Sequence, residues 1–230
     1  MTRTTTALIA LSLVIGCQNS DTDATQDIDT VQISGNFWDS VLGTGADNVE
    51  VCLESHPEMA CAYTDSSGDY TLEIPATEQS TLSVASEDYA PHLYAIDPLL
   101  EDLNDVSAGI SRRSLQDILQ ANIGAASDAT EGNVHVRVED VEGVTVTMEA
   151  AYDVVHYWAD SDTEEGAVLT ETSTIGTMHF AVVEAGDHLL TVSHPTLTCR
   201  PDAMTWGEAE GETVVPVRDG YTTVLWFVCD

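Results

Sequence analysis

Oxygen-bearing side chains gather in the short segment YTDSSGDYTLEIP, which runs from Tyr63 to Pro75. They belong to Asp65, Ser66, Ser67 and Asp69, with Gly68 among them. This composition suits either a calcium loop or a tight turn between two strands. The 12-residue EF-hand loop ends in a bidentate Glu, and the residue at that place, counted from Asp65, is Ala76. The sequence therefore favours the turn.

A second set of residues has the atoms of a non-haem iron site. Intradiol ring-cleaving dioxygenases bind iron through two tyrosines and two histidines. The only comparable cluster here is Tyr152, His156, Tyr157 and His179. His156 and Tyr157 are adjacent, so in a strand they point to opposite faces. We therefore expect core or rim packing for these aromatic residues, and no metal site or cofactor.

The remaining histidines fit no catalytic triad, because the chain has neither a G-x-S-x-G elbow nor a reactive unpaired cysteine. They are His56, His92, His135, His188 and His194. We expect them to be structural and the protein to be non-catalytic.

The first cysteine follows a short apolar run. Arg3 precedes this run, which extends from Ala7 to Gly16 and is about half the ~20 residues that span a bilayer. It is typical of a signal peptide. The tetrad VIGC, ending at Cys17, resembles the bacterial lipobox, which implies cleavage before Cys17 and diacylation of its sulfur; a plain secretory signal is the alternative. Gln18 follows instead of the Asp that favours retention in the inner membrane, so the resemblance to the lipobox implies the outer membrane.

Four cysteines remain in the exported chain, and an even number indicates disulfide bonds. They are Cys52, Cys61, Cys199 and Cys229. Three pairings are possible, and sequence proximity favours Cys52 with Cys61 and Cys199 with Cys229. No CxxC or HxxxH spacing is present, which argues against zinc.

The charge is strongly negative. Without Arg3, five arginines face forty Asp and Glu, a net charge of −35, and there is no lysine. A polyanion repels nucleic acid and anionic lipid headgroups, so neither is an expected partner. The excess acid indicates adaptation to high salt, with calcium capture as the competing explanation.

Short alternating segments predict an all-β fold of two small antiparallel sandwiches joined by a short helix. The expected organisation is a signal peptide over 1–16, an acidic tether over 17–30, a sandwich over 31–97, a linker over 98–131 and a second sandwich over 132–230. In the linker, SRRSLQDILQANIG predicts an amphipathic helix capped by Ser111 or Ser114 and stopped by Gly124.

The segments ISGNFWDSVLGTGADNVEVCLE, TDSSGDYTLEIP and TLSVASEDYAP together resemble the carboxypeptidase regulatory-like domain, a transthyretin-like (prealbumin-like) β-sandwich. Its pattern residues correspond to Gly35, Val49, Val51, Thr64, Asp65, Gly68, Tyr70, Tyr89 and Pro91. The resemblance implies that Asp65 accepts backbone N–H bonds, Gly68 takes a positive φ and Tyr70 faces the core. A fainter echo around 175–195 suggests that the second sandwich is a diverged copy, with a generic immunoglobulin-like sandwich as the alternative.

These observations predict a lipid-anchored cell-envelope protein with a structural, adhesive or scaffolding role. Its expected partners are the membrane, through the lipid on Cys17, and a cell-surface protein or glycan. The alternative is a carbohydrate-binding module that stacks sugars on tryptophan, although at least three of the tryptophans are expected in the core. The four tryptophans are Trp38, Trp158, Trp206 and Trp226.

Overall fold

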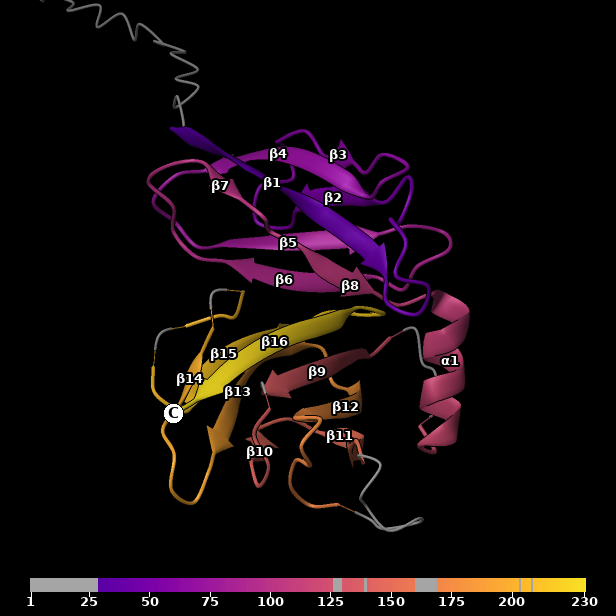
Figure 1. Ribbon diagram of the computed structural model, residues 1–230, viewed down its shortest axis with the longest axis vertical. Helices are drawn as coiled ribbons and strands as arrows, with labels where there is room; N and C mark the ends of the chain where they lie inside the picture. The colour runs from indigo at the N-terminus through magenta and orange to yellow at the C-terminus, as the bar shows by residue number, and fades with distance from the viewer. Residues whose placement is uncertain (1–28, 126–129, 139, 160–168, 203, 208) are drawn as a thin grey trace, which may run out of the picture.

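The structure is a computed structural model that describes residues 29–125, 130–138, 140–159, 169–202, 204–207 and 209–230. These residues form strands β1 to β16 and helix α1, so the predicted all-β class is correct (Figure 1). None of the described helical residues forms a segment long and apolar enough to cross a membrane. The predicted signal peptide, Cys17 and most of the acidic tether lie outside the described residues.

The first sandwich is the upper half of Figure 1 and consists of β1 to β8. Its outer sheet has β1 at its centre, antiparallel to β4 and parallel to β7 and β8, and its inner sheet has the order β3-β2-β5-β6. Apolar residues alternate along the strands and fill the space between the sheets, with Phe37, Leu72 and Tyr94 among them. The bounds are β1 (Thr30–Asp39), β2 (Glu50–Leu53), β3 (Ala62–Tyr63), β4 (Asp69–Pro75), β5 (Ser80–Ala85), β6 (His92–Ile96), β7 (Leu103–Asn104) and β8 (Ala108–Ile110).

The second sandwich is the lower half of Figure 1 and consists of β9 to β16. One sheet has the order β11-β12-β9-β16, with β14 paired to β16, and the other has the order β10-β13-β15. Val136, Phe180 and Phe227 are fully buried between them. The bounds are β9 (Gly132–Val138), β10 (Thr145–Met148), β11 (Tyr152–Tyr157), β12 (Thr177–Val183), β13 (Gly186–Ser193), β14 (Cys199–Pro201), β15 (Glu212–Val217) and β16 (Thr222–Cys229).

The two sandwiches share one sheet, which sequence analysis did not predict. The start of β16 pairs in parallel with β6, Thr222 opposite His92, and thereby joins the inner sheet of the first sandwich to the β11-β12-β9-β16 sheet. Side chains alternate along β6, and all its residues are buried. Tyr94 packs into the first core, whereas Leu93 packs into the second. The two outer layers therefore cover opposite faces of the shared sheet.

The segment predicted as a linker also contributes to the first sandwich. Strands β7 and β8 lie within 98–131 and pair with β1, and Val106 and Ile110 are buried in the first core. Residues 98–131 therefore form part of the first sandwich as well as the helix.

Helix α1 (Arg113–Asn122) lies beside both halves (Figure 1). The predicted serine cap is wrong: the N-cap is Arg112, and no side chain accepts a capping hydrogen bond. Gly124 does follow the helix at a φ of 79°, where glycine adopts the left-handed conformation without strain. Ile118 is 56% exposed, but Leu115, Leu119 and Ile123 are half-buried and Gln120 is buried, so the packed face includes polar residues beside most of the predicted apolar ones.

Residues 65–68 form a turn that leads into β4. Asp65 Oδ1 accepts the backbone N–H groups of Ser67 and Asp69 at 2.8 and 3.1 Å, Gly68 has a φ of 85°, and Tyr70 is buried. A Cβ on Gly68 would lie 2.1 Å from the Phe37 carbonyl oxygen. The backbone itself therefore requires glycine here.

Both disulfides have the pairing that sequence proximity favours. Cys52 is bonded to Cys61 beside β2 and β3, and Cys199 is bonded to Cys229, joining β14 to the last strand. The second bond fixes the C-terminal end of β16, the strand whose other end connects the sandwiches.

Candidate functional site

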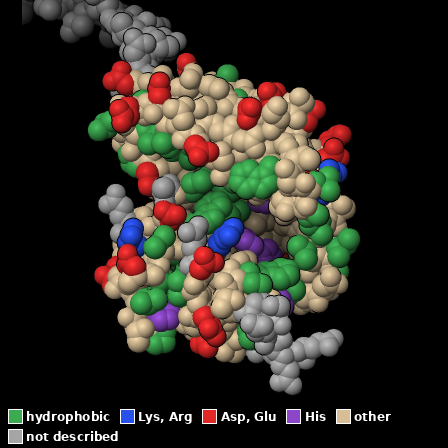
Figure 2. All heavy atoms as spheres, viewed as in Figure 1, with side chains coloured by type: hydrophobic (Ala, Val, Ile, Leu, Met, Phe, Trp, Pro, Cys, Tyr) green, Lys and Arg blue, Asp and Glu red, His purple; other side chains and the backbone are tan. Residues whose placement is uncertain are grey.

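A cavity of about 360 Å³ lies where the two sandwiches meet, and we call it the junction cavity. Its floor is the face of β9, β12 and β16 that the second sandwich leaves uncovered. The end of the first sandwich forms one wall through Trp38 and Gly109, and helix α1 forms another through Leu119 and Ile123. Figure 2 shows this hollow between the halves, with histidine side chains inside it and hydrophobic side chains around it.

The strand register places three histidines in a row on the sheet face that forms the floor, and His135 and His179 of this row line the cavity. His156 of β11 is opposite His179 of β12, which is opposite His135 of β9. Directly paired residues project from the same face of a sheet, so the three rings lie side by side. The His135 and His179 ring centroids are 6.0 Å apart. His92 of β6 lies on the same face, two strands from His135, because Thr222 of β16 pairs with His92 and with Asn133.

These histidines are neutral at physiological pH. Burial lowers the pKa of His92 to about 4, against the opposing effect of a 2.7 Å hydrogen bond between Nδ1 and the Ala90 carbonyl oxygen. Burial, with a smaller contribution from the charge of Arg137, lowers the pKa of His135 to about 4. Burial also lowers the pKa of His179 to about 3. Neutral imidazoles offer both a donor and an acceptor to a ligand.

Three of the four tryptophans line the junction cavity, and the expectation of at least three in the core is therefore wrong. Trp226 stacks on Tyr94 at 5.7 Å, Trp158 meets the His156 ring edge-on at 5.1 Å, and Trp38 is 36% exposed. Trp206 is the exception and is buried in the second core.

A glycine allows one of these indoles to reach its place. A Cβ on Gly109 would lie 3.0 Å from Nε1 of Trp38. The indole therefore lies against the backbone of β8, in space that a larger residue would take.

Helix α1 is held over the cavity by polar contacts at both sandwiches. Gln116 donates to Thr222 Oγ1 at 2.6 Å, and Gln120 donates to Asn133 Oδ1 at 2.9 Å. These bonds explain why polar residues occupy the inner face of the helix. Because the contacts are side-chain specific and join residues distant in sequence, helical periodicity alone could not reveal them.

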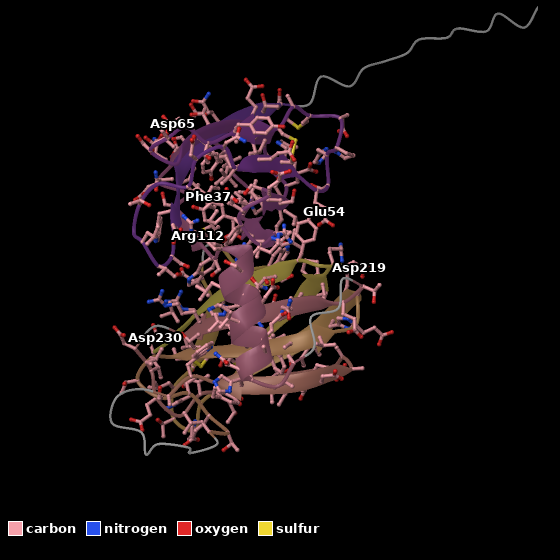
Figure 3. The ribbon with its side chains drawn as sticks, turned by 90° about the vertical axis from the view of Figure 1, so that its right-hand side faces the viewer. Phe37, Glu54, Asp65, Arg112, Asp219 and Asp230 are labelled. Carbon is pink, nitrogen blue, oxygen red and sulfur yellow. A yellow bond between two sulfur atoms is a disulfide. The ribbon has the colours of Figure 1, made fainter. Side chains whose placement is uncertain are left out.

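Arg112 lies at the first sandwich, next to the start of helix α1 (Figure 3). It donates from Nε to the buried carboxylate of Asp39 at 2.6 Å, and its guanidinium lies over the Tyr89 ring. Asp39 also accepts the backbone N–H groups of Val41 and Leu42. Burial raises the pKa of Asp39, but these hydrogen bonds and the Arg112 charge outweigh it, and the net pKa is lowered. The charged pair fixes the start of α1 beside the cavity.

Several groups at the cavity have no hydrogen-bond partner among the residues that the structure describes. The indole nitrogen of Trp158 is buried without a hydrogen bond, and the rings of His135 and His179 make none among the described residues. Buried polar groups are almost always hydrogen-bonded to protein, water or ligand. The junction cavity therefore presents unused donors and acceptors beside aromatic surfaces.

The residues of the hypothetical iron site do not come together. His156 and His179 lie on the cavity face, but Tyr157 points into the second core, where its hydroxyl donates to the Val146 carbonyl oxygen at 3.3 Å. Tyr152 is 39% exposed and packs against Phe180.

A set of three potential metal ligands in the described residues is formed by Glu50, Cys52 and Cys61. Both cysteines are in a disulfide bond, so their sulfurs are not available as thiolates. Of the other predicted structural histidines, His56 pairs with Glu58 and Glu78 at the surface.

Neither a protein-family model nor a curated protein matches the chain. Solved structures with some likeness include the Bacillus anthracis TIE protein, with a TM-score of 0.30 and 12% identity over 87% of this chain and 34% of that one. Another is GBS52, the minor pilin of Streptococcus agalactiae, with a TM-score of 0.28 and 11% identity over 86% of this chain and 95% of that one. A third is the shaft pilin spaA of Lactobacillus rhamnosus GG, with a TM-score of 0.26 and 8% identity over 88% of this chain and 98% of that one. The chain spans about a third of the length of the Bacillus anthracis TIE protein. TM-scores this low carry no argument about function.

Proposed function

We propose that this chain is a cell-envelope protein, anchored through a lipid on Cys17, whose junction cavity binds a carbohydrate. The observation that carries the proposal is the convergence of Trp38, Trp158 and Trp226 on one cavity. Sugar rings have apolar C–H faces that pack on indole surfaces, and polar edges that need hydrogen bonds. An aromatic cavity with a few convergent polar groups is the general form of a small-ligand site.

The polar requirement is met by groups that the protein leaves unused. Neutral His135 and His179 line the cavity and each offer a donor and an acceptor. Sugar hydroxyls both donate and accept, so they complement such a set. The volume of about 360 Å³ lies at the lower end of the ~300–1,000 Å³ typical of ligand pockets and suits a mono- or disaccharide unit.

Glycan binding joins the two functions that the sequence suggests. A lipid-anchored protein that holds a surface glycan is adhesive, and the first sandwich supplies one wall of the site. We also propose that residues 31–97 form a carboxypeptidase regulatory-like module, on the strength of the motif residues given above. A purely scaffolding role would not require unpaired polar groups beside three tryptophans.

The test is a glycan array followed by titration calorimetry on the full mature chain, kept in detergent. Trp38→Ala and Trp158→Ala are expected to weaken binding by about 10-fold, in line with ~1.5 kcal/mol for an aromatic stacking contact. Trp206→Phe is the matched control, because the Trp206 indole is buried in the second core. The Trp206→Phe variant should bind the glycan with the affinity of the wild type. Thermal melts establish that each variant is folded. Failure of every glycan to bind, or equal affinity in all the variants, would refute the proposal.

A further inference from the structure

The lining of the junction cavity contains no carboxylate among the described residues. The chain as a whole has forty Asp and Glu. Four other hollows on the described surface each include acidic residues, among them Asp187, Glu54, Glu73 and Asp88. As far as the structure describes its lining, the junction cavity is therefore a non-acidic site within an acidic protein.

Arg137 of β9 lines this cavity and is unpaired within the described chain. Three other arginines form ion pairs: Arg112 with Asp39, Arg200 with Asp230, and Arg218 with Glu54 and Asp187. Arg113 donates to the carbonyl oxygens of Ser86 and Tyr89. A guanidinium has five N–H donors in a planar fork that matches a carboxylate or sulfate, and in Arg137 this fork is unused.

The neighbours of Arg137 on the cavity floor are uncharged. His135 lies two residues away on the same face of β9, and Trp226 of β16 pairs directly with Arg137. With His135 neutral, the guanidinium of Arg137 carries the only charge among the described residues of the lining. No described acidic residue in the lining neutralises it.

We infer that the carbohydrate bound in the junction cavity carries an anionic group, a carboxylate or a sulfate, and that Arg137 binds it. This inference rests on the proposed function and adds the chemical class of the sugar. The negative charge of the whole protein opposes the approach of an anion. Salt screens this long-range repulsion, because the Debye length is only about 3 Å at 1 M. A direct contact between the guanidinium and the anion is weakened much less.

The experiment uses sugars that differ only at C6: galactose, galacturonate and galactose 6-sulfate, with the corresponding glucose series. Each is titrated into the full mature chain in detergent at 0.5 M NaCl by calorimetry. We expect one or both anionic sugars to bind about 10- to 100-fold more tightly than the neutral sugar of the same series, as a charge-assisted hydrogen bond implies. The two anionic arms distinguish a carboxylate from a sulfate.

Arg137→Gln should abolish the preference for the anionic sugar, and the melting temperature should stay unchanged because Arg137 has no partner among the described residues. Arg200→Gln removes the same charge from an exposed residue outside the cavity and should retain the preference. Tighter or equal binding of neutral sugars would overturn this inference and leave the proposed function standing. Loss of the preference in Arg200→Gln would also overturn it. Failure of all six sugars to bind would count against both.

Discussion

Acidification should destabilise this protein through His92 in particular. His92 is buried at the junction of the sandwiches, and its pKa is lowered from an ordinary 6.5 to about 4. Above pH 6.5 the ring is neutral in both the folded and the unfolded chain, and its titration has no effect on stability. Between pH 6.5 and pH 4 the unfolded chain takes up a proton at His92 and the folded chain does not, so stability is lost as the pH falls.

The size of the effect follows from the pKa difference. At ~1.4 kcal/mol per pH unit, His92 should cost the folded state about 2 kcal/mol at pH 5 and about 3 kcal/mol once the pH is below 4. His92→Asn keeps a donor near the Ala90 carbonyl and removes the titration. Urea unfolding of both proteins at pH 7.5 and pH 5 should show that the stability advantage of the wild type shrinks by about 2 kcal/mol.

His56→Asn is the control with the opposite sign. Hydrogen bonding to Glu58, opposed by burial and supported by Glu78, raises the pKa of His56. A raised pKa adds stability that is fully present below pH 6.5 and is lost as the pH rises through the folded pKa. The wild-type advantage over His56→Asn should therefore grow on acidification. Parallel pH profiles for the wild type and His92→Asn would refute the reasoning about the buried ring.

Four further outcomes are expected. Asp39→Ala should lower the free energy of unfolding by about 2 kcal/mol in urea titrations, because it removes the partner of Arg112 and of two backbone N–H groups; unchanged stability would contradict this. Gly68→Ala should cost ~1–3 kcal/mol through strain against Phe37, and a neutral result would show that the turn relaxes. The melting temperature should climb between 0.01 and 1 M NaCl, where the Debye length falls from about 30 to 3 Å; a saturating rise specific to calcium would instead support cation capture. The Cys17→Ser variant should not partition into detergent. If the variant partitioned into detergent as the wild type does, the lipid anchor would be excluded.

The strands and the turn could be predicted because their signals are local. Apolar alternation in segments such as 69–75 follows directly from the geometry of a strand with one buried face. Gly68 and Asp65 have roles that a four-residue turn determines by itself. The disulfide pairing was favoured for the same reason, since each pair closes a short loop in the sequence.

The junction cavity could not be predicted, because it depends on one distant pairing. The two-residue parallel contact of β16 with β6 places the outer layers of the sandwiches on opposite faces of a shared sheet, and so leaves the His135 face open. The apolar character of Trp38 and Trp226 suggested core positions, but it does not distinguish a core from an aromatic cavity. Alternation did place His156 and Tyr157 on opposite faces, which separates the residues of the iron hypothesis.

The most direct test of glycan binding at the junction cavity follows the four indole N–H resonances of the full chain by two-dimensional NMR during titration with the tightest glycan on the array. Assignment comes from single substitution of each tryptophan by phenylalanine. Binding in the cavity predicts saturable shifts for Trp38, Trp158 and Trp226 and a stationary Trp206 resonance. Stationary cavity resonances at saturation, or a shift confined to Trp206, would contradict the account.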